Sequence, residues 1–336
     1  MNQPCKPILR VQDLHVYYPV ETGTMFHRQT TMLKALNGVS FEMAPGESLG
    51  IVGESGCGKS TLARAILGLQ QPTRGRVLWQ CEPLHEMSAD TLREKRKELQ
   101  IIFQDPVASL NPRMKIGEII AEPLRNFYPR MEKVQIEERV KGMMQMVGLL
   151  PNLLNRYPHE FSGGQCQRVG IARALILNPK LVVCDEPVSS LDVSIQAQIV
   201  NLLKDLQKKL SLSLIFIAHD LSVVKSISER VMVMYLGRVM ELAPREEIYT
   251  QPRHPYTSDL MRAVPIPDPE VERNKMDILT YGDTPSPMDP PSGCSFRTRC
   301  PWARDRCAAD VPILRRLGGE GRVACHYADE IDLQER

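Results

Sequence analysis

Apolar residues in this chain gather in short, nearly unbroken runs that are separated by longer, mixed stretches. The short runs are typical of buried strands, and they lie at Ser48–Gly53, Leu181–Cys184 and Leu212–Ala218. The longer stretches predict helices at Lys59–Leu69, Gln135–Val147, Gln167–Leu177 and Ile195–Leu210. Because strands alternate with helices, the pattern predicts an α/β fold with a mainly parallel sheet covered on both faces.

Two other segments break this alternation. The block from Asp105 to about Glu160 has few strand signals. Residues 265–291 contain seven prolines, which cannot continue regular structure, so this stretch is interpreted as a linker. A small tail that carries several cysteines follows it.

Length and composition exclude some classes of protein. The chain has 336 residues, of which 43% are hydrophobic and 24% charged, so we expect a globular chain of about two domains. The net charge of +2 gives no support to a nucleic-acid-binding protein. The longest apolar stretch, near Ser211–Ala218, is far shorter than the roughly 20 residues that cross a bilayer, and Met1–Arg10 lacks the apolar region of a secretion signal. We therefore expect neither an integral membrane protein nor an exported one.

A phosphate-binding loop lies between the first predicted strand and the first predicted helix. Residues 53–60 match the pattern G-x4-G-K-[ST] without exception. Its glycines allow backbone N–H groups to surround a phosphate, Lys59 would reach the terminal phosphates, and Ser60 would ligate Mg²⁺. The candidate ATP-binding residues here are Gly53, Glu54, Ser55, Gly56, Cys57, Gly58, Lys59, Ser60 and Thr61.

Two neighbouring carboxylates end a later strand. Asp185 and Glu186 follow the apolar run that begins at Leu181. A carboxylate at the end of a strand can hold Mg²⁺ near the phosphates, and a second one can polarise an attacking water. A solvated acidic turn is the alternative for such a pair, but it is less suited to a chain with a phosphate-binding loop.

The segment Phe161-Ser-Gly-Gly-Gln165 resembles the Leu-Ser-Gly-Gly-Gln signature of ATP-binding-cassette (ABC) ATPases. Taken alone, it is better explained as a plain helix N-terminus that is capped by Ser162. The other family motifs are present in family order: the phosphate loop, Gln104, the signature, Asp185-Glu186, Ser189-Ser-Leu-Asp192 and His219. By these motifs, the chain resembles the ABC ATPases.

The resemblance assigns roles to matching residues. It implies that Glu186 is the catalytic base, that His219 acts near the γ-phosphate, and that Asp192 links the two sites of a dimer. It implies that Gln104 contacts Mg²⁺ and water, and that Tyr18 stacks on adenine, with Tyr17 or a purely structural tyrosine as alternatives. The Mg²⁺ ligands are then Ser60, Gln104 and Asp185. The signature residues that would face the partner's ATP are Ser162, Gly163, Gly164 and Gln165.

The resemblance also implies the fold. It predicts a RecA-like P-loop core with a mixed sheet, a helical signature subdomain and a small cysteine-bearing extension. The corresponding ranges are 1–104 for the first part of the core with an N-terminal β subdomain, 105–165 for the signature subdomain, 166–250 for the second part of the core, and 251–336 for the extension. ABC cassettes pair head to tail, so one chain supplies only half of each ATP site.

Further segments resemble the ATPases of oligopeptide and dipeptide importers, most closely the F-type dipeptide-import ATPase. They include Ser109-Leu-Asn-Pro-Arg113, Arg156-Tyr-Pro-His159 and Arg253-His-Pro-Tyr-Thr257. The implied partners are a homologous D-type ATPase, two membrane permease subunits and, indirectly, a periplasmic or extracellular peptide-binding protein. The implied location is the cytoplasmic face of the bacterial inner membrane, as a peripheral subunit. The alternatives are an importer of nickel, glutathione or another small solute, a soluble ABC ATPase of DNA repair or translation, and a regulatory subunit with an inactive site.

Four of the nine cysteines fall in the tail, at Cys294, Cys300, Cys307 and Cys325. Without a secretion signal we expect reduced thiols, which favours metal binding over disulfides. Their spacing is poor for a zinc ribbon, whereas four thiolates suffice for a [4Fe–4S] cluster, which the peptide-importer resemblance also implies. Zinc and unligated cysteines are the alternatives, and His326 is a spare ligand or a solvated side chain.

One residue departs from the family pattern. Cys166 follows the signature where relatives often carry Arg or Lys, so we expect weaker electrostatics there. Cys57, inside the phosphate loop, is interpreted as a small side chain that fits.

Overall fold

The computed structural model describes residues 7–24, 27–263 and 284–333, and within them the chain forms two compact units. The first contains Ala44–Ser48 and Glu86–Ala218. The second contains Pro7–Met43, Leu49–His85 and the described residues from His219 onward. The long central segment and the terminal parts of the chain therefore pack separately.

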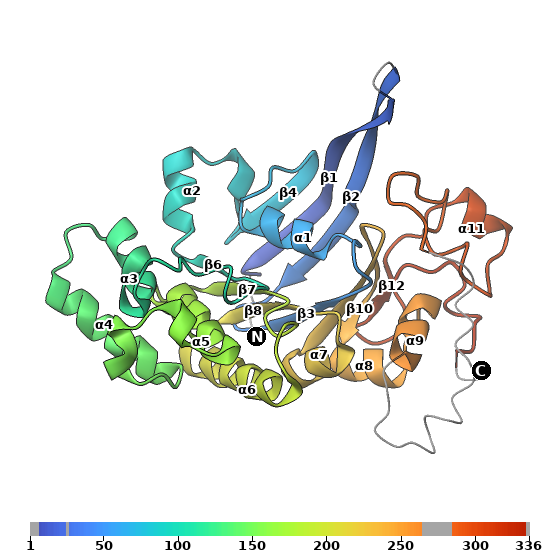
Figure 1. Ribbon diagram of the computed structural model, residues 1–336. Coiled ribbons are helices and arrows are strands. Elements are labelled where there is room, and N and C mark those ends of the chain that lie inside the picture. Colours follow the sequence, from blue (N-terminus) through green and yellow to red (C-terminus); the bar gives the residue numbers. More distant parts are fainter. Residues whose placement is uncertain (1–6, 25–26, 264–283, 334–336) are drawn as a thin grey trace, which may run out of the picture. The chain divides into compact units, whose positions relative to one another are not determined.

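The first unit is built on parallel strands in the order β6 (Leu99–Ile102), β7 (Leu181–Asp185) and β8 (Ser213–Ile217). Strand β8 is buried throughout, as is β7 up to its last residue, which explains their unbroken apolar runs. The helices of this unit are α2 (Ala89–Lys95), α3 (Ile116–Phe127), α4 (Lys133–Met146), α5 (Gly163–Leu175) and α6 (Val193–Leu210). Helices α3, α4 and α5 contact one another and form a helical group (Figure 1).

The second unit contains two sheets. One is antiparallel, in the order β2 (His27–Met43), β1 (Leu9–Thr24), β4 (Arg74–Trp79) and β5 (Glu82–Pro83). Its β1 and β2 form the long ribbon in Figure 1. The other runs β11 (Arg315–Arg316), β12 (Arg322–Val323), β10 (Arg238–Pro244), β9 (Arg230–Tyr235) and β3 (Ser48–Val52), and only its β3–β9 pair is parallel.

Short helices accompany these sheets: α1 (Lys59–Ile66), α7 (Leu221–Ile227), α8 (Arg245–Thr250), α9 (Pro255–Arg262) and α11 (Asp305–Ala309). The core of the unit includes Trp79, Tyr235, Tyr256 and Phe296, each at most 1% exposed. Tyr235, Tyr256 and Phe296 pack against one another, so β9, α9 and the cysteine-bearing tail share one buried interior.

The three predicted strands and four predicted helices are confirmed, with ends shifted by a few residues. The largest shift is at α5, which begins at Gly163 rather than Gln167 because Ser162 caps it. The expectation of a mainly parallel sheet is corrected, since β1, β2, β4 and β10 pair antiparallel and the architecture is mixed, as the ABC resemblance implies.

The proline-rich segment 265–291 lies outside the described residues up to position 283, and its remainder forms turns and irregular structure. In the described part of the chain, none of the helices combines the length and the apolar character that a membrane span requires.

Candidate ATP-hydrolysis site

The phosphate loop connects β3 to α1, as predicted, and close backbone contacts require glycine at Gly53 and Gly58. A Cβ atom on Gly58 would lie 2.3 Å from the carbonyl oxygen of Ala35, and one on Gly53 would lie 2.2 Å from that of Met234. Gly58 also has a φ of 103°, which L-residues rarely adopt. The loop is therefore held tightly against neighbouring strands, and α1 begins directly after it.

Lys59 is buried and its ammonium group lies inside the loop. Its Nζ donates to the carbonyl oxygens of Gly53 at 2.8 Å and Glu54 at 3.0 Å. Ser60 is exposed and Thr61 half-buried at the start of α1, where the first backbone N–H groups of a helix have no partner within it. The loop thus presents a cation and a helix N-terminus together, which is the arrangement that binds phosphate.

The remaining loop residues differ in exposure. Ser55 and Gly56 are exposed, while Cys57 is only 3% exposed and lies 3.9 Å from Lys59 through its sulfur. Burial raises the pKa of the Cys57 thiol, so it stays neutral. This supports its interpretation as a small buried side chain.

The first unit brings Gln104 and Glu186 together, although they lie 82 positions apart. Nε2 of Gln104 donates to Oε2 of Glu186 at 3.0 Å. Both residues follow the ends of parallel strands, β6 and β7, which end at the same edge of a sheet. Asp185, the last residue of β7, is half-buried beside them.

The backbone of Glu186 is unusual. It has a φ of 48°, in the left-handed region, and its N–H donates to the carbonyl oxygen of Ile217 at 3.0 Å. The hydroxyl of Ser189 donates to the Glu186 carbonyl at 3.1 Å. Strained conformations of this kind persist where surrounding contacts enforce them, and they concentrate at functional sites.

The signature motif forms the start of α5. The backbone N–H of Gln165 donates to Oγ of Ser162, and that of Ser162 donates to Oε1 of Gln165, which completes a capping box. Ser162 and Gln165 are exposed, and Gly163 is half-buried. A Cβ on the buried Gly164 would lie 2.6 Å from Cγ2 of Ile195, so this glycine permits α5 and α6 to approach.

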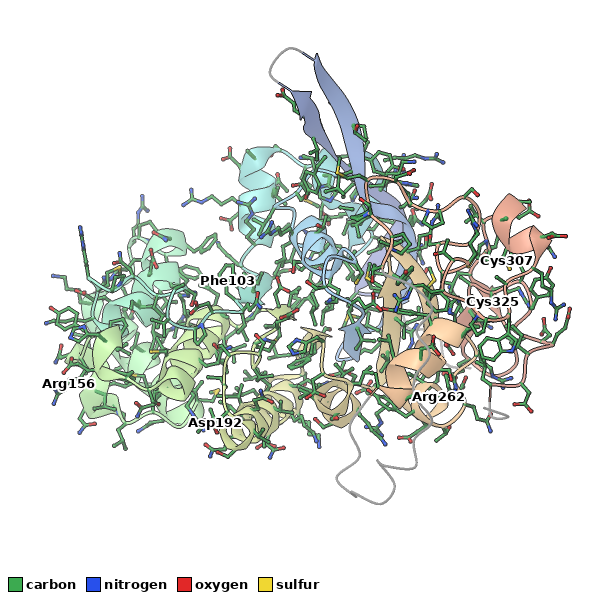
Figure 2. The ribbon with its side chains drawn as sticks, turned by 45° about the vertical axis from the view of Figure 1, so that its right-hand side comes forward. Phe103, Arg156, Asp192, Arg262, Cys307 and Cys325 are labelled. Carbon is green, nitrogen blue, oxygen red and sulfur yellow. The ribbon has the colours of Figure 1, made fainter. Side chains whose placement is uncertain are left out.

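Asp192 caps α6 and is exposed (Figure 2). Its Oδ1 accepts from the Ser194 hydroxyl at 2.7 Å and from the Ile195 N–H at 3.0 Å, and these hydrogen bonds lower the pKa of its carboxyl group. The Asp192 carboxyl group is therefore ionised at neutral pH.

His219 and Tyr18 belong to the second unit. His219 is exposed just after β8, and Asp220 next to it caps α7 by accepting from the Ser222 N–H at 2.7 Å. Tyr18 is half-buried, and so is Tyr17, whose hydroxyl donates to Asn37 and lies 2.9 Å from Nδ1 of His15. These contacts fix the Tyr17 side chain.

Cys166 faces the interior. It is fully buried, its thiol donates to the Pro158 carbonyl at 3.6 Å, and burial raises its pKa. A neutral side chain suits this position. Position 166 lies in the interior, whereas Ser162 and Gln165 are exposed. The missing positive charge is therefore missing from the interior and not from the exposed part of the signature.

The four tail cysteines line one small pocket, together with side chains that include Phe296 and Trp302. Cys294 and Cys307 are buried, and their segments are joined by a 2.8 Å hydrogen bond from the Cys294 N–H to the Cys307 carbonyl. Figure 2 shows Cys307 and Cys325 on neighbouring stretches of this tail. Among the described residues there is no group of three or more His, Cys, Asp or Glu side chains placed to hold a metal ion.

His326 lines the same pocket, but its Nε2 lies 3.0 Å from the carbonyl oxygen of Asp310. This contact gives one ring nitrogen of His326 a protein partner, so the position of the side chain is explained without a metal ligand role.

Two contacts of the phosphate loop had no signal in the sequence. The N–H of Glu54 donates to the hydroxyl of Tyr256 at 3.0 Å, and the Glu54 carboxylate pairs with Arg299 at 2.9 Å. Arg299 lies 245 positions away from Glu54, between Cys294 and Cys300 of the tail.

Comparison with known proteins agrees with this geometry. The family model described as ABC transporter matches residues 36–189, and that described as oligopeptide/dipeptide transporter, C-terminal region, matches residues 240–307. The oligopeptide transport ATP-binding protein OppF of Salmonella typhimurium is 61% identical over 310 residues, which are 92% of this chain and 93% of that protein. The oligopeptide transport ATP-binding protein AppF of Bacillus subtilis is 48% identical over 322 residues, 95% of this chain and 97% of that protein.

Solved structures show the same fold. The cbiO1 protein of Clostridium perfringens, part of an ABC transporter complex, has a TM-score of 0.62 at 28% identity and covers 73% of this chain and 92% of its own. The ATP-binding cassette MJ0796, in a dimeric post-hydrolysis state bound to ADP and Pi, has the same TM-score and identity and covers 70% of this chain and 98% of its own.

Proposed function

The chain belongs to the ABC transporter family and is the ATP-hydrolysing subunit of a peptide importer, and on that premise we propose that Glu186 is the base that activates the attacking water. The observation that carries this assignment is the hydrogen bond between Gln104 and Glu186. The Gln104 amide orients the Glu186 carboxylate, and a carboxylate held at this position can accept a proton from water.

The other polar residues bind and neutralise ATP. Lys59 exchanges its bonds to the loop carbonyls for the terminal phosphates, and the backbone N–H groups at the start of α1 hold them. Ser60, Gln104 and Asp185 would hold Mg²⁺, which neutralises charge that develops on the phosphates. His219 steadies the transferred phosphoryl group, and Tyr18 stacks on adenine.

Hydrolysis requires a dimer. ABC cassettes bind ATP between one subunit's phosphate loop and the other's signature, which here comprises Ser162 to Gln165. The exposure of Ser162 and Gln165 at the start of α5 supports this role, because a helix N-terminus that is open to solvent can meet a phosphate. Asp192, at the start of α6, would link the two sites.

We assign the second cassette to a homologous D-type ATPase, which makes the working pair a heterodimer. The identity with F-type relatives supports this assignment, because such subunits are expected to pair with a D-type counterpart. Closure on ATP and reopening after hydrolysis would move two permease subunits, which receive cargo from a peptide-binding protein outside the membrane. The chain would then lie on the cytoplasmic face of the inner membrane as a peripheral subunit, with 105–165 as its signature subdomain.

The importer is tested by co-purifying the chain with its permeases and D-type partner and measuring ATP hydrolysis in proteoliposomes. Di- and oligopeptides presented with the binding protein should stimulate hydrolysis, whereas nickel or glutathione should not. Stimulation by nickel or glutathione alone would assign the cargo to the related importers instead.

We propose that the four tail cysteines hold a [4Fe–4S] cluster. The support is their convergence on one pocket and their chemistry, since each iron takes its own thiolate. The gaps of five, six and seventeen residues between the cysteines are poor for a zinc ribbon, which favours close C-x2–4-C pairs. Burial raises the pKa of Cys294 to about 11 and that of Cys300 to about 12, so bound metal would displace their protons.

The cluster is tested on anaerobically purified protein by its visible absorption and its iron and sulfide content. A broad band near 400 nm with about four irons per chain is expected. Colourless protein that contains zinc, or protein free of metal after strictly anaerobic handling, would contradict the cluster and leave the ATPase assignment intact.

A further inference from the structure

A side chain of the C-terminal extension reaches the phosphate loop. Arg299 lies between Cys294 and Cys300 in sequence, and its Nη1 is 2.9 Å and 3.0 Å from the two carboxylate oxygens of Glu54. The Arg299 side chain is 9% exposed and that of Glu54 is 27% exposed. The contact is therefore largely shielded from water, where ion pairs are stronger than at the surface.

Aromatic rings hold the guanidinium in place. Cζ of Arg299 lies 5.7 Å from the ring centre of Tyr235 and 5.7 Å from that of Phe296. The Tyr235 hydroxyl is 3.4 Å from Nη1 of Arg299, and its ring packs against Tyr256 at 4.7 Å. This cluster joins β9, α9 and the tail, so the position of Arg299 is set by the packed interior of the second unit.

Glu54 is fixed through its other polar groups as well. Its N–H donates to the Tyr256 hydroxyl at 3.0 Å, and its Oε2 accepts from the hydroxyl of Thr284 at 2.7 Å. Its carbonyl oxygen accepts from Nζ of Lys59 at 3.0 Å. A continuous set of contacts therefore runs from Arg299 through Glu54 to the lysine that binds phosphate.

The charge of Glu54 needs this compensation. A carboxylate within the phosphate loop repels the phosphates of ATP, and in a poorly solvated setting the repulsion is weakly screened. The buried guanidinium neutralises that carboxylate and holds it in contact with the C-terminal extension.

We propose that Arg299 is a positioning residue for ATP binding: the C-terminal extension supplies a cation that neutralises Glu54 and fixes the phosphate loop. The proposal rests on the assignment of this loop as the ATP site, and it gives the extension a direct part in nucleotide affinity. Arg299 touches no phosphate itself and acts through Glu54.

The test is a charge-suppression experiment on the full chain with a fluorescent ATP analogue. Arg299→Gln is expected to weaken binding about five- to tenfold, because an unpaired carboxylate then faces the phosphates. Adding Glu54→Gln to Arg299→Gln is expected to restore affinity to within about twofold of the unmodified chain, since the repelling charge is gone. The kcat of the assembled importer should change less than the KM for ATP in Arg299→Gln.

Arg304→Gln is the matched control. Arg304 lies in the same extension and pairs with Glu330 at 2.6 Å, with both side chains at least half exposed, so its loss should leave nucleotide affinity unchanged. Equal affinities of Arg299→Gln and Arg304→Gln, or an Arg299→Gln defect that Glu54→Gln does not relieve, would overturn the proposal. If the unmodified chain binds no analogue, the ATP-site assignment fails instead.

Thr284→Val keeps the test valid if Arg299→Gln does not fold. It removes the hydroxyl that donates to Glu54 at 2.7 Å and accepts a longer contact from Nη1 of Arg299 at 3.4 Å, and it leaves the ion pair between Arg299 and Glu54 in place. Binding about two- to threefold weaker, again relieved by Glu54→Gln, is expected; a loss that persists in the double variant would contradict neutralisation of Glu54.

Discussion

At the scale of single residues, the chemistry depends on polar groups whose positions are fixed by the backbone. The Lys59 ammonium is held by the carbonyls of Gly53 and Glu54, and the Glu186 carboxylate is held by Gln104. On the proposed assignment, the Gln104 contact preorganises the charge of Glu186, whereas Lys59 exchanges its carbonyl partners for phosphate when ATP binds. Preorganised charge stabilises a transition state without further rearrangement, which is a large contribution to catalysis.

Replacing Lys59 by Ala should lower ATP hydrolysis by about a hundredfold or more, because the cation at the terminal phosphates is lost. The measurement is the steady-state rate of the assembled importer. Lys141→Ala is the control, since Lys141 pairs with Glu137 on the exposed side of α4. The importer that carries Lys141→Ala should hydrolyse ATP at the normal rate. A Lys59→Ala rate close to that of Lys141→Ala would contradict the role of the loop.

At the scale of elements, the signature combines a helix cap with a packing requirement. Ser162 and Gln165 satisfy each other's backbone groups, and Gly164 faces Ile195 of α6 without room for a side chain. The motif is therefore both a helix N-terminus and a candidate phosphate-binding surface. Its two glycines should respond differently to substitution.

Gly164→Ala should destabilise the protein by about 1–3 kcal/mol, because the added Cβ overlaps Ile195. Gly163→Ala, whose Cβ would lie 3.4 Å from Leu191, should change the free energy of unfolding by about 0.5 kcal/mol or less. Urea unfolding of both variants measures the difference. Equal stabilities would show that α5 and α6 are not packed as described.

Three elements with continuous apolar runs were predicted from the sequence, although β9, which is equally apolar and buried from Val231 to Tyr235, was missed. Strands β3, β7 and β8 are buried along almost their whole length and were evident. In β1 the inward residues are interrupted by register shifts, such as that between Val11 and Leu14, which break the alternation of a half-buried strand.

The same limit applies to the site. Local motifs identified the phosphate loop, the signature and Asp185-Glu186, because their chemistry lies in consecutive residues. The Arg299–Glu54 pair joins residues 245 positions apart, and its partners are ordinary by themselves. Only packing of the tail against β9 and α9 brings them together.

At the scale of the whole molecule, stability should depend on pH through a half-buried histidine, His85. Burial lowers the pKa of His85 in the folded chain, partly opposed by a backbone contact with Ala65, whereas the unfolded value is about 6.5. Below pH 6.5 the unfolded state therefore binds more protons than the folded state, and stability falls as the pH drops.

Urea unfolding between pH 7.5 and 5.5 tests this dependence. The unmodified chain should lose stability toward pH 5.5, and His85→Gln should show a shallower loss because the titrating group is removed. Identical slopes for the two proteins would assign the acid sensitivity to other groups.

We propose that two cassettes enclose ATP and that Glu186 then activates the attacking water. Hydrolysis reopens the pair of cassettes and drives peptide import. Gln104 orients Glu186, and the amide in Glu186→Gln keeps the shape of the side chain but cannot accept the proton.

The measurement that tests this account most directly is ATP turnover and ATP retention in the assembled importer carrying Glu186→Gln. Hydrolysis should fall by about a hundredfold or more while ATP remains bound in closed dimers, because binding is intact and the base is missing. Turnover at the normal rate, with no retained ATP, would contradict Glu186 as the base.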